Sequence, residues 1–205
     1  MEIKYLGWQS FKIRGKEAIV LTQPFEKNKT GILFPKTKAE IILSKNQLSQ
    51  EVKTRISSRK RKTGPVFFSG PGEYEAERVE IIGSGQSFWF RLENRGICWL
   101  NEKNIADLKS IPASQTDILL IGLEKTRSGW SNNVKQLIDY FSPFFIIPFP
   151  NFSLSEKELL VGHWSKDFLD LVDEESLKPA DSLKIPENEI LEEEKEVVIL
   201  KPLAK

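Results

Sequence analysis

The chain has 205 residues, 40% of them hydrophobic, which fits one globular domain that can bury a core. Because 30 basic residues nearly balance 29 acidic ones, the net charge of +1 excludes a general attraction to nucleic acid, anionic membranes or acidic substrates. We therefore expect a single domain over residues 1–205, in which any charged partner binds a local patch.

The single cysteine and the first residues of the chain indicate a compartment. Cys98 cannot form an internal disulfide, and its place between Ile97 and Trp99 in a strand-like run predicts a buried structural thiol. Residues 1–5 lack the basic and apolar regions of a signal peptide, and no apolar run reaches membrane-spanning length. The sequence predicts a cytoplasmic protein with no membrane partner.

The first 25 residues predict a meander of three strands. Apolar and polar residues alternate over residues 2–6 and again over residues 10–14, with a break at Gly7. Residues 18–21 then form a third apolar run, after the turn at Gly15. We expect two short antiparallel hairpins here.

The apolar run over residues 41–43 predicts a buried strand that ends abruptly in a polar loop. A helix of one or two turns is expected over residues 50–56. The end of such a strand is where an α/β protein would place its chemistry. Residues 44–49 contain no His, Cys, Asp or Glu, so the loop lacks the usual catalytic groups.

A further apolar run, residues 66–68, predicts a compact strand that leads into Gly70, Pro71 and Gly72. The Pro-Gly pair is typical of a type II turn, because Pro71 fixes its own φ and Gly72 accepts a positive φ. Backbone amides in such a turn could cradle phosphate. Because Pro71 removes one of these donors, we favour a structural turn.

Residues 87–92 and 97–100 predict a hairpin around residues 93–96. In this interpretation Trp89 and Trp99 face each other across the two strands, so cross-strand packing accounts for both rings.

The last third of the chain predicts a βαβ unit. Two buried strands, residues 118–122 and 144–148, flank a helix over residues 132–141 with Ser131 as its N-cap. Three further elements are expected: a short helix over residues 104–110, a helix over residues 165–173 and a last strand over residues 197–200.

Several short motifs occur in a characteristic order along the chain: Tyr5-Leu6-Gly7, Ser10-Phe11, Pro24-Phe25, Gly70-Pro71-Gly72-Glu73-Tyr74-Glu75, Ile97-Cys98-Trp99-Leu100, Ile146-Ile147-Pro148 and the tail from Ile185 to Leu200. In this order they resemble the metallo-β-lactamase-fold hydrolases, in the subgroup that includes ascorbate-6-phosphate lactonase-like proteins. The resemblance implies fold class α/β (α+β), with a four-layer αβ/βα sandwich of the metallo-β-lactamase type.

In enzymes of this family, the strand that corresponds to residues 41–43 ends in a His-x-His-x-Asp-His motif that holds one or two metal ions. Aligned by Ser44, the chain has Lys45 and Gln47 at the first two histidines, Ser49 at the aspartate and Gln50 at the last histidine. An ammonium has no free lone pair, and neutral amide and hydroxyl oxygens are poor ligands for zinc. The resemblance therefore implies a degenerate metal site.

The remaining ligand positions of the family are also altered. Gln23 stands where a carboxylate is usual, the link over residues 83–86 has no histidine, and the last histidine is replaced around residues 149–150. Glu102, near the bridging aspartate position, is the one acidic group expected to survive. Independently of any family, a catalytic zinc site needs about three protein ligands. One His and one Cys in the whole chain predict no metal and no cofactor.

The only histidine, His163, could act as a general base, but no nucleophile or orienting carboxylate is spaced near it, which favours a loop or core role. A basic run offers another possible site, because it could neutralise the phosphates of a nucleic acid or be a solvated loop. Its residues are Arg55, Arg59, Lys60, Arg61 and Lys62.

The sequence thus favours a non-catalytic binding or assembly module over an enzyme, with a protein partner or a second copy of the chain as candidate partners. One alternative is a metal-dependent hydrolase of phosphoesters or lactones with an atypical site that uses Glu102. The other is a nucleic-acid-binding protein that uses the basic run.

Overall fold

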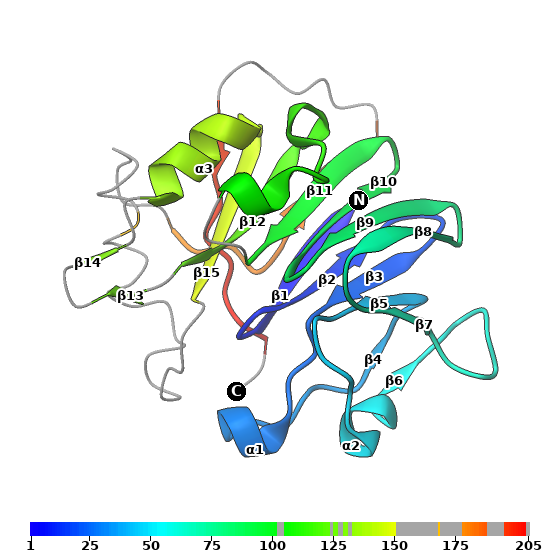
Figure 1. Ribbon diagram of the computed structural model, residues 1–205. Coiled ribbons are helices and arrows are strands. Elements are labelled where there is room, and N and C mark those ends of the chain that lie inside the picture. The colour runs from blue at the N-terminus through cyan, green and yellow to red at the C-terminus, as the bar shows by residue number, and fades with distance from the viewer. Residues whose placement is uncertain are drawn as a thin grey trace.

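The computed structural model describes residues 1–101, 105–123, 125–126, 129–130, 133–150, 168, 178–187 and 195–203. Within these residues two mixed sheets stack face to face, and short helices lie on their outer faces (Figure 1). The predicted four-layer α/β sandwich is confirmed.

The first sheet has six strands in the order β16-β1-β2-β3-β5-β7. Its antiparallel part, β1 to β3, is the predicted meander, and β3, β5 and β7 pair in parallel. The expected buried strand over residues 41–43 is β5. The strands are β1 (Glu2–Gly7), β2 (Ser10–Arg14), β3 (Ile19–Thr22), β5 (Ile41–Leu43), β7 (Val66–Phe68) and β16 (Leu183–Lys184).

The second sheet has seven strands in the order β17-β15-β12-β11-β10-β9-β8. Strands β12 and β15 pair in parallel, as the predicted βαβ unit requires, with α3 (Asn133–Phe141) between them in the chain. The strands are β8 (Gly72–Ala76), β9 (Val79–Ser84), β10 (Ser87–Leu92), β11 (Arg95–Leu100), β12 (Ile118–Leu123), β15 (Phe145–Pro150) and β17 (Glu196–Val197). Two further pairs are β4 (Thr37–Lys38) with β6 (Ile56–Ser57) and β13 (Lys125–Thr126) with β14 (Gly129–Trp130).

Apolar side chains from both sheets form the core between them. Three aromatic rings join the sheets there: Trp99 stacks on Phe149 with ring centroids 6.0 Å apart, and Phe11 meets Phe149 edge-on at 5.4 Å. Such large buried rings contribute much of the apolar area that stabilises a core.

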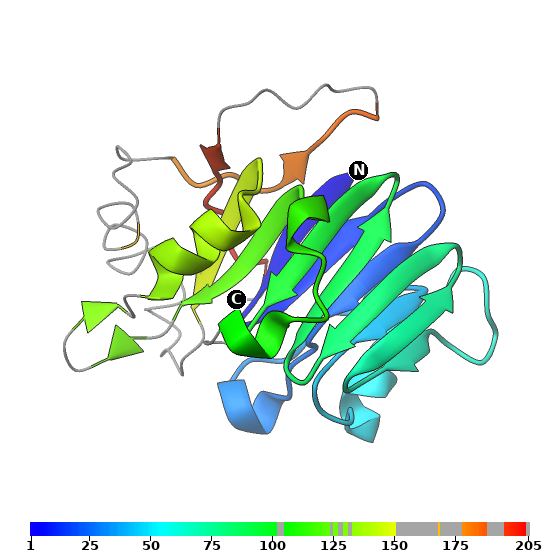
Figure 2. The same ribbon diagram turned by 45° about the horizontal axis from the view of Figure 1, so that its top comes forward.

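Each sheet also has an apolar region on its outer face that a covering layer buries. On the second sheet this layer contains α3, η1 (Ile105–Leu108) and η2 (Ala113–Gln115), and Figure 2 shows α3 lying across the strands. Cys98 is buried on this face, as predicted. On the first sheet the layer contains α2 (Gln50–Lys53) and the segment around α1 (Lys27–Thr30). The expected helix after residue 49 is thus a single turn.

The register of the β10–β11 hairpin corrects one prediction. Trp99 pairs with Phe88, and Trp89 pairs with Cys98, so the two tryptophans lie on opposite faces of the sheet. The reason is the turn, which consists of only Glu93 and Asn94, with φ of 51° and 61°. A two-residue turn with two positive φ values fixes the pairing, and neighbouring residues on a strand point to opposite faces.

The Pro-Gly segment is also different from a type II turn. Gly72 has the positive φ that was predicted, but its value of 146° is far from the roughly 80° of that turn type. The segment instead links β7 of the first sheet to β8 of the second. Gly70 passes so close to Gly83 that a Cβ at Gly83 would lie 2.2 Å from the Gly70 carbonyl oxygen.

The short helix expected over residues 104–110 is the 3₁₀ turn η1. The predicted last strand is shorter than expected, with β17 ending at Val197 and an isolated bridge joining Leu200 to Ala180. Ser131, His163 and nearly all of the helix predicted over residues 165–173 lie outside the described residues.

No helix in the described part of the chain has both the length and the apolar character needed to cross a membrane.

Candidate functional site

Strand ends from both sheets meet at the Trp8–Gln9 turn between β1 and β2. The Gln9 carbonyl accepts a hydrogen bond of 3.0 Å from the Trp99 indole of the second sheet and one of 3.4 Å from the Thr22 hydroxyl at the end of β3. Leu43, the last residue of β5, pairs with Thr22. The loop after β5, which holds the predicted site, therefore lies at this edge of the sandwich.

A cavity of ≈ 190 Å³ opens beside that loop. Its wall combines apolar side chains with amide, hydroxyl and ammonium groups. Lys45 and Gln47, two of the predicted degenerate ligand positions, line it, and so does Gln23. The other lining residues are Trp8, Gln9, Pro24, Phe25, Glu26, Lys29, Thr30, Ser44, Asn46 and Leu48.

Gln23 holds the loop in place at the position where the family has a carboxylate. Its side-chain oxygen accepts a hydrogen bond of 3.0 Å from the Lys45 N–H and one of 3.4 Å from the Ser44 hydroxyl. The Ser44 hydroxyl also donates to the Asn46 carbonyl at 2.9 Å. The loop is therefore organised by amide and hydroxyl groups of the chain itself.

Two residues that line the cavity have strained backbones. Trp8 has φ of 56° and Gln23 has φ of 34°, in the region that favours glycine. Each such residue costs about 1–3 kcal/mol and persists only where its surroundings fix it. The Tyr5 hydroxyl donates to the Trp8 carbonyl at 2.6 Å, and the Gln23 N–H donates to the Leu43 carbonyl at 2.7 Å. Strain of this kind is typical of functional sites.

Some buried polar side-chain atoms have no hydrogen-bond partner. Among the described residues five such side-chain atoms occur, and four of them belong to Trp8, Ser49, Ser84 and Asn101. Ser84 is the last residue of β9, and Asn101 directly follows β11. Ser87 lies between them: it pairs with Ser84, and its hydroxyl accepts a hydrogen bond of 2.9 Å from the Asn101 N–H. Because an unpaired buried polar atom costs about 1–3 kcal/mol, a hydrogen bond to any of these atoms would be stabilising, and of the four residues only Trp8 lines the cavity.

Two other predicted ligand positions, Ser49 and Gln50, lie away from the cavity wall. Ser49 precedes α2 as its N-cap without using its hydroxyl to cap it, and Gln50 is exposed at the first helical position, so neither lines the cavity. Glu102, the predicted acidic survivor, lies outside the described residues. The sequence placed the bridging-aspartate position near Asn101 and Glu102 but singled out only Glu102, and it gave Trp8 and Ser84 no role in this cleft.

The donors at this edge do not fit a zinc ion. Imidazole, thiolate and carboxylate are the usual zinc ligands, whereas Lys45, Gln47 and Gln23 supply an ammonium and two amides. Glu26 is the one carboxylate among the lining residues, and it is paired with Lys29 at 3.6 Å. Nowhere in the described ranges do three or more His, Cys, Asp or Glu side chains gather in a group that could hold a metal.

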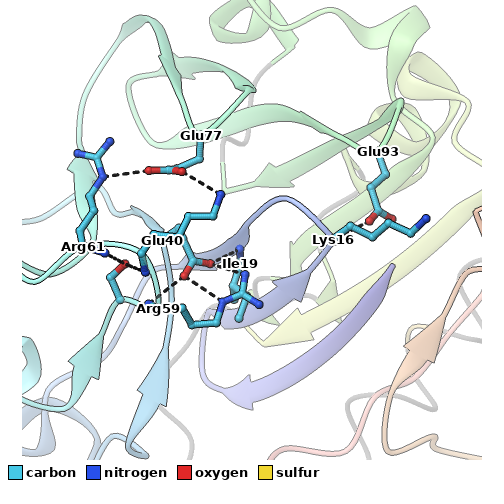
Figure 3. A network of polar contacts seen from close by, with 9 residues as sticks. Lys16, Ile19, Glu40, Arg59, Arg61, Glu77 and Glu93 are labelled. Atoms are coloured by element: carbon cyan, nitrogen blue, oxygen red, sulfur yellow. Dashed lines mark hydrogen bonds and ion pairs between the residues drawn. The ribbon is translucent and has the colours of Figure 1, made fainter.

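The basic run predicted as a nucleic-acid contact begins with two arginines that bind inward, the second of which, Arg59, is drawn in Figure 3. Arg55 donates to the Phe34 carbonyl. The Arg59 guanidinium binds the fully buried Glu40 carboxylate through Nε at 3.1 Å and a terminal nitrogen at 2.9 Å. Burial alone would raise the pKa of Glu40, but hydrogen bonds from Arg59 and from two backbone N–H groups outweigh it and lower that pKa.

The next two residues of the run share one acidic partner. Lys60 and Arg61 both bind the Glu77 carboxylate, at 3.0 and 2.9 Å, and these bonds lower its pKa (Figure 3). Of the run, only Lys62 has no ion pair or hydrogen bond among the described residues. Nucleic-acid contact through this run remains a prediction, and these pairings argue against it.

Comparisons with known proteins place this geometry in a family. Residues 2–150 match the family model described as "Beta-lactamase superfamily domain". A solved structure from Thermotoga maritima, described as a Zn-dependent hydrolase of the metallo-β-lactamase superfamily, is 20% identical with a TM-score of 0.71 and covers 98% of both chains. Comparison with curated proteins gives no match.

Two other solved structures are more distant. A metallo hydrolase from the archaeon Ignicoccus hospitalis is 7% identical with a TM-score of 0.55, and isothiocyanate hydrolase from Delia radicum gut bacteria is 9% identical with a TM-score of 0.54. Each alignment covers 90% of this chain and 99% of the other. At such identities the likeness shows the fold alone. A single domain over residues 1–205 remains a prediction.

Proposed function

The chain belongs to the β-lactamase superfamily, and we propose that it is a non-catalytic member whose cleft binds a small polar ligand without a metal ion. The observation that carries this proposal is the cavity beside the β5 loop, where Lys45 and Gln47 take the places of the expected imidazole ligands. A hydrolytic metal site needs lone pairs that can grip the ion, and these side chains provide weak ones or none.

The architecture of the loop supports the same proposal. In an enzyme of this family the bound ion would draw the loop residues together. Here the hydrogen bonds that Gln23 accepts from Lys45 and Ser44 perform that role, so the loop keeps its shape when no ion is bound.

The unpartnered groups indicate what kind of ligand fits. In the cavity wall the Trp8 indole offers an unpartnered donor, and Phe25 and Leu48 add apolar surface. The Ser84 hydroxyl and the Asn101 side-chain oxygen are also unpartnered but do not line the cavity. A ligand with hydrogen-bonding groups and a small apolar part matches this wall. A cavity that is partly apolar and has a few convergent polar groups is the usual form of a small-molecule site.

Metal loading and turnover test the proposal against the rival hydrolase. We expect the chain, equilibrated with zinc, manganese or magnesium and then desalted, to retain far less than one ion and to leave phosphodiester and lactone substrates unchanged. Stoichiometric metal, with turnover lost in Glu102→Ala but kept in the control Glu75→Ala, would establish the hydrolase instead. Glu75 is a suitable control because it is exposed on β8.

Two narrower assignments belong to this proposal. Membership of the ascorbate-6-phosphate lactonase-like subgroup is supported by the motif Gly70 to Glu75, and a cytoplasmic location by the single cysteine, Cys98. Neither assignment is needed for the metal test.

A further inference from the structure

The outer face of the first sheet is divided into an apolar half and a charged half. Over β3 and β5 this face is apolar and covered, with Ile19, Leu21 and Ile42 buried there. Over β16, β1 and β2 the outward positions are charged instead. The inward residues of β1 and β2 belong to the core, so the alternation of a strand leaves Lys4, Lys12 and Arg14 on the outside.

Strand register brings these cations together. Lys4 lies directly opposite Lys12, while Glu2 lies between Arg14 on one side and Lys184 on the other. We call Lys4, Lys12, Arg14 and Lys184 the cationic face. Arg59 lies close enough to Lys12 to act on its charge.

The acidic groups nearby do not neutralise the cationic face. Glu2 forms an ion pair with Lys4 at 3.3 Å, and Glu40 forms one with Arg59. Among the described carboxylates none forms an ion pair with Lys12, Arg14 or Lys184.

The cations of this face repel one another. Like charges directly opposite each other on a sheet are destabilising. Burial lowers the pKa of Lys12, and the neighbouring charges of Lys4 and Arg14 lower it further. The clustered charges therefore lower the stability of the free chain, and a bound anionic partner would offset that loss.

A hollow adjoins the cationic face. It has a volume of ≈ 590 Å³, and Arg14 and Lys184 of the face contribute to its wall together with Arg59 and Lys16. Three glutamates and the N-terminus also line it, but Lys16 already binds Glu187 and the N-terminal ammonium already binds Glu93. The free cations of the hollow are thus those of the cationic face.

We propose that the cationic face binds the phosphate backbone of a nucleic acid, without preference for base sequence. Paired strands hold the four cations side by side, with Arg14 and Lys184 exposed and Lys4 and Lys12 half-buried. None of the four side chains is aromatic, so nothing in the face would stack on a base. Contacts with phosphates alone position a nucleic acid but do not read its sequence.

Other anionic partners fit the face less well. Stable membrane binding combines cations with apolar side chains that enter the lipid. Beside the described part of this face one exposed leucine, Leu203, lies at the edge of β1, where its N–H donates to the Tyr5 carbonyl. An acidic protein would need aromatic or apolar anchors at the centre of the interface, which the four cations do not supply. Nucleic acid, with the highest charge density of the three, needs only cations. This inference is independent of the cleft and of its metal.

The test is fluorescence anisotropy of the full chain with a mixed-sequence 20-nucleotide RNA and a 20-base-pair DNA duplex, from 50 to 200 mM KCl. Each phosphate contact contributes about 0.7 to 0.9 to the slope of log affinity against log salt, so we expect a slope of about −2 to −4. The variant Lys12→Gln/Arg14→Gln/Lys184→Gln should bind at least about tenfold more weakly at 50 mM KCl, with a correspondingly shallower slope.

A matched control separates this face from the basic run. Lys60→Gln/Arg61→Gln/Lys62→Gln removes the same charge from residues of which two are already bound to Glu77, and it should change affinity less than about twofold. Thermal melting checks that both variants fold. The proposal is overturned if neither nucleic acid binds, if only the control variant weakens binding, or if vesicles with anionic lipid or a polyglutamate peptide bind as tightly as RNA.

Discussion

The Arg59 guanidinium closes over the Glu40 carboxylate with two hydrogen bonds, of 2.9 and 3.1 Å, at the point where the chain enters β5. Glu40 also accepts from the Ile19 N–H at 2.8 Å and from the Arg59 N–H at 3.1 Å, and its side chain is fully buried. One buried carboxylate thus joins β3, the start of β5 and the loop that holds the basic run.

Substituting Arg59, the exposed partner of this pair, should lower the free energy of unfolding. We expect Arg59→Met to lower the free energy of unfolding by about 2–4 kcal/mol at pH 7, because it leaves a buried carboxylate without its counter-ion. Urea denaturation measures the change. The control Arg78→Met removes an exposed arginine whose ion pair with Glu17 is 3.8 Å long, and should cost less than about 0.5 kcal/mol. Equal losses of unfolding free energy in the two variants would show that the Arg59–Glu40 ion pair stabilises the fold no more than an exposed pair does.

The same carboxylate should make stability depend on acid pH. The folded state lowers the pKa of Glu40 and of Glu77 below the ordinary value of 4.5, so the unfolded chain binds more protons in this range. The stability from both groups is complete above pH 4.5 and is lost as the pH falls through their lower folded pKa values. The destabilisation caused by Arg59→Met should therefore shrink between pH 6 and pH 3, and a constant or growing difference would contradict this assignment.

Gln23 should stabilise the cleft loop by accepting its two hydrogen bonds. We expect Gln23→Ala to lower the free energy of unfolding by about 1–2 kcal/mol and to speed amide hydrogen exchange at Lys45. Gln50→Ala removes an exposed glutamine from the same region and should have an effect below about 0.5 kcal/mol. Unchanged exchange at Lys45 in Gln23→Ala would mean that something else holds the loop.

Gly96 should tolerate no side chain. A Cβ there would lie 1.7 Å from the Gln115 carbonyl oxygen, a backbone atom that cannot turn aside. We expect Gly96→Ala to cost about 3 kcal/mol or more, measured by thermal unfolding. The control is Gly31→Ala, where a Cβ meets open space and only the φ of 76° opposes the change, at a cost of about 1 kcal/mol. A smaller loss at Gly96 than at Gly31 would contradict the packing described here.

The general architecture followed from the sequence, because it depends on local alternation and on the order of elements. The meander, β5 and the βαβ unit around α3 all appear where the hydrophobic pattern predicts them. The pairing of Trp89 and Trp99 was wrong because register depends on the length of the turn: residues 93–96 were predicted to form it, whereas only Glu93 and Asn94 do.

The charges were harder to predict because their partners are distant in the chain. Residues 59–62 of the basic run are exposed, but the sequence did not show that Arg59 binds Glu40, 19 residues away, or that Arg61 binds Glu77, 16 residues away. Conversely, Lys4 and Lys12 are single charges in alternating strands, and only the register of β1 with β2 brings them together. The degenerate ligand positions were separated for a related reason, since Ser49 and Gln50 start α2 while Lys45 and Gln47 line the cavity.

Anomalous diffraction at the zinc absorption edge, from crystals grown with zinc, tests the metal-free cleft most directly. Our account predicts no ordered anomalous peak within the cavity lined by Gln23, Lys45 and Gln47. An ordered ion there, held by side chains of this polypeptide, would contradict it and return the protein to the metal-dependent hydrolases.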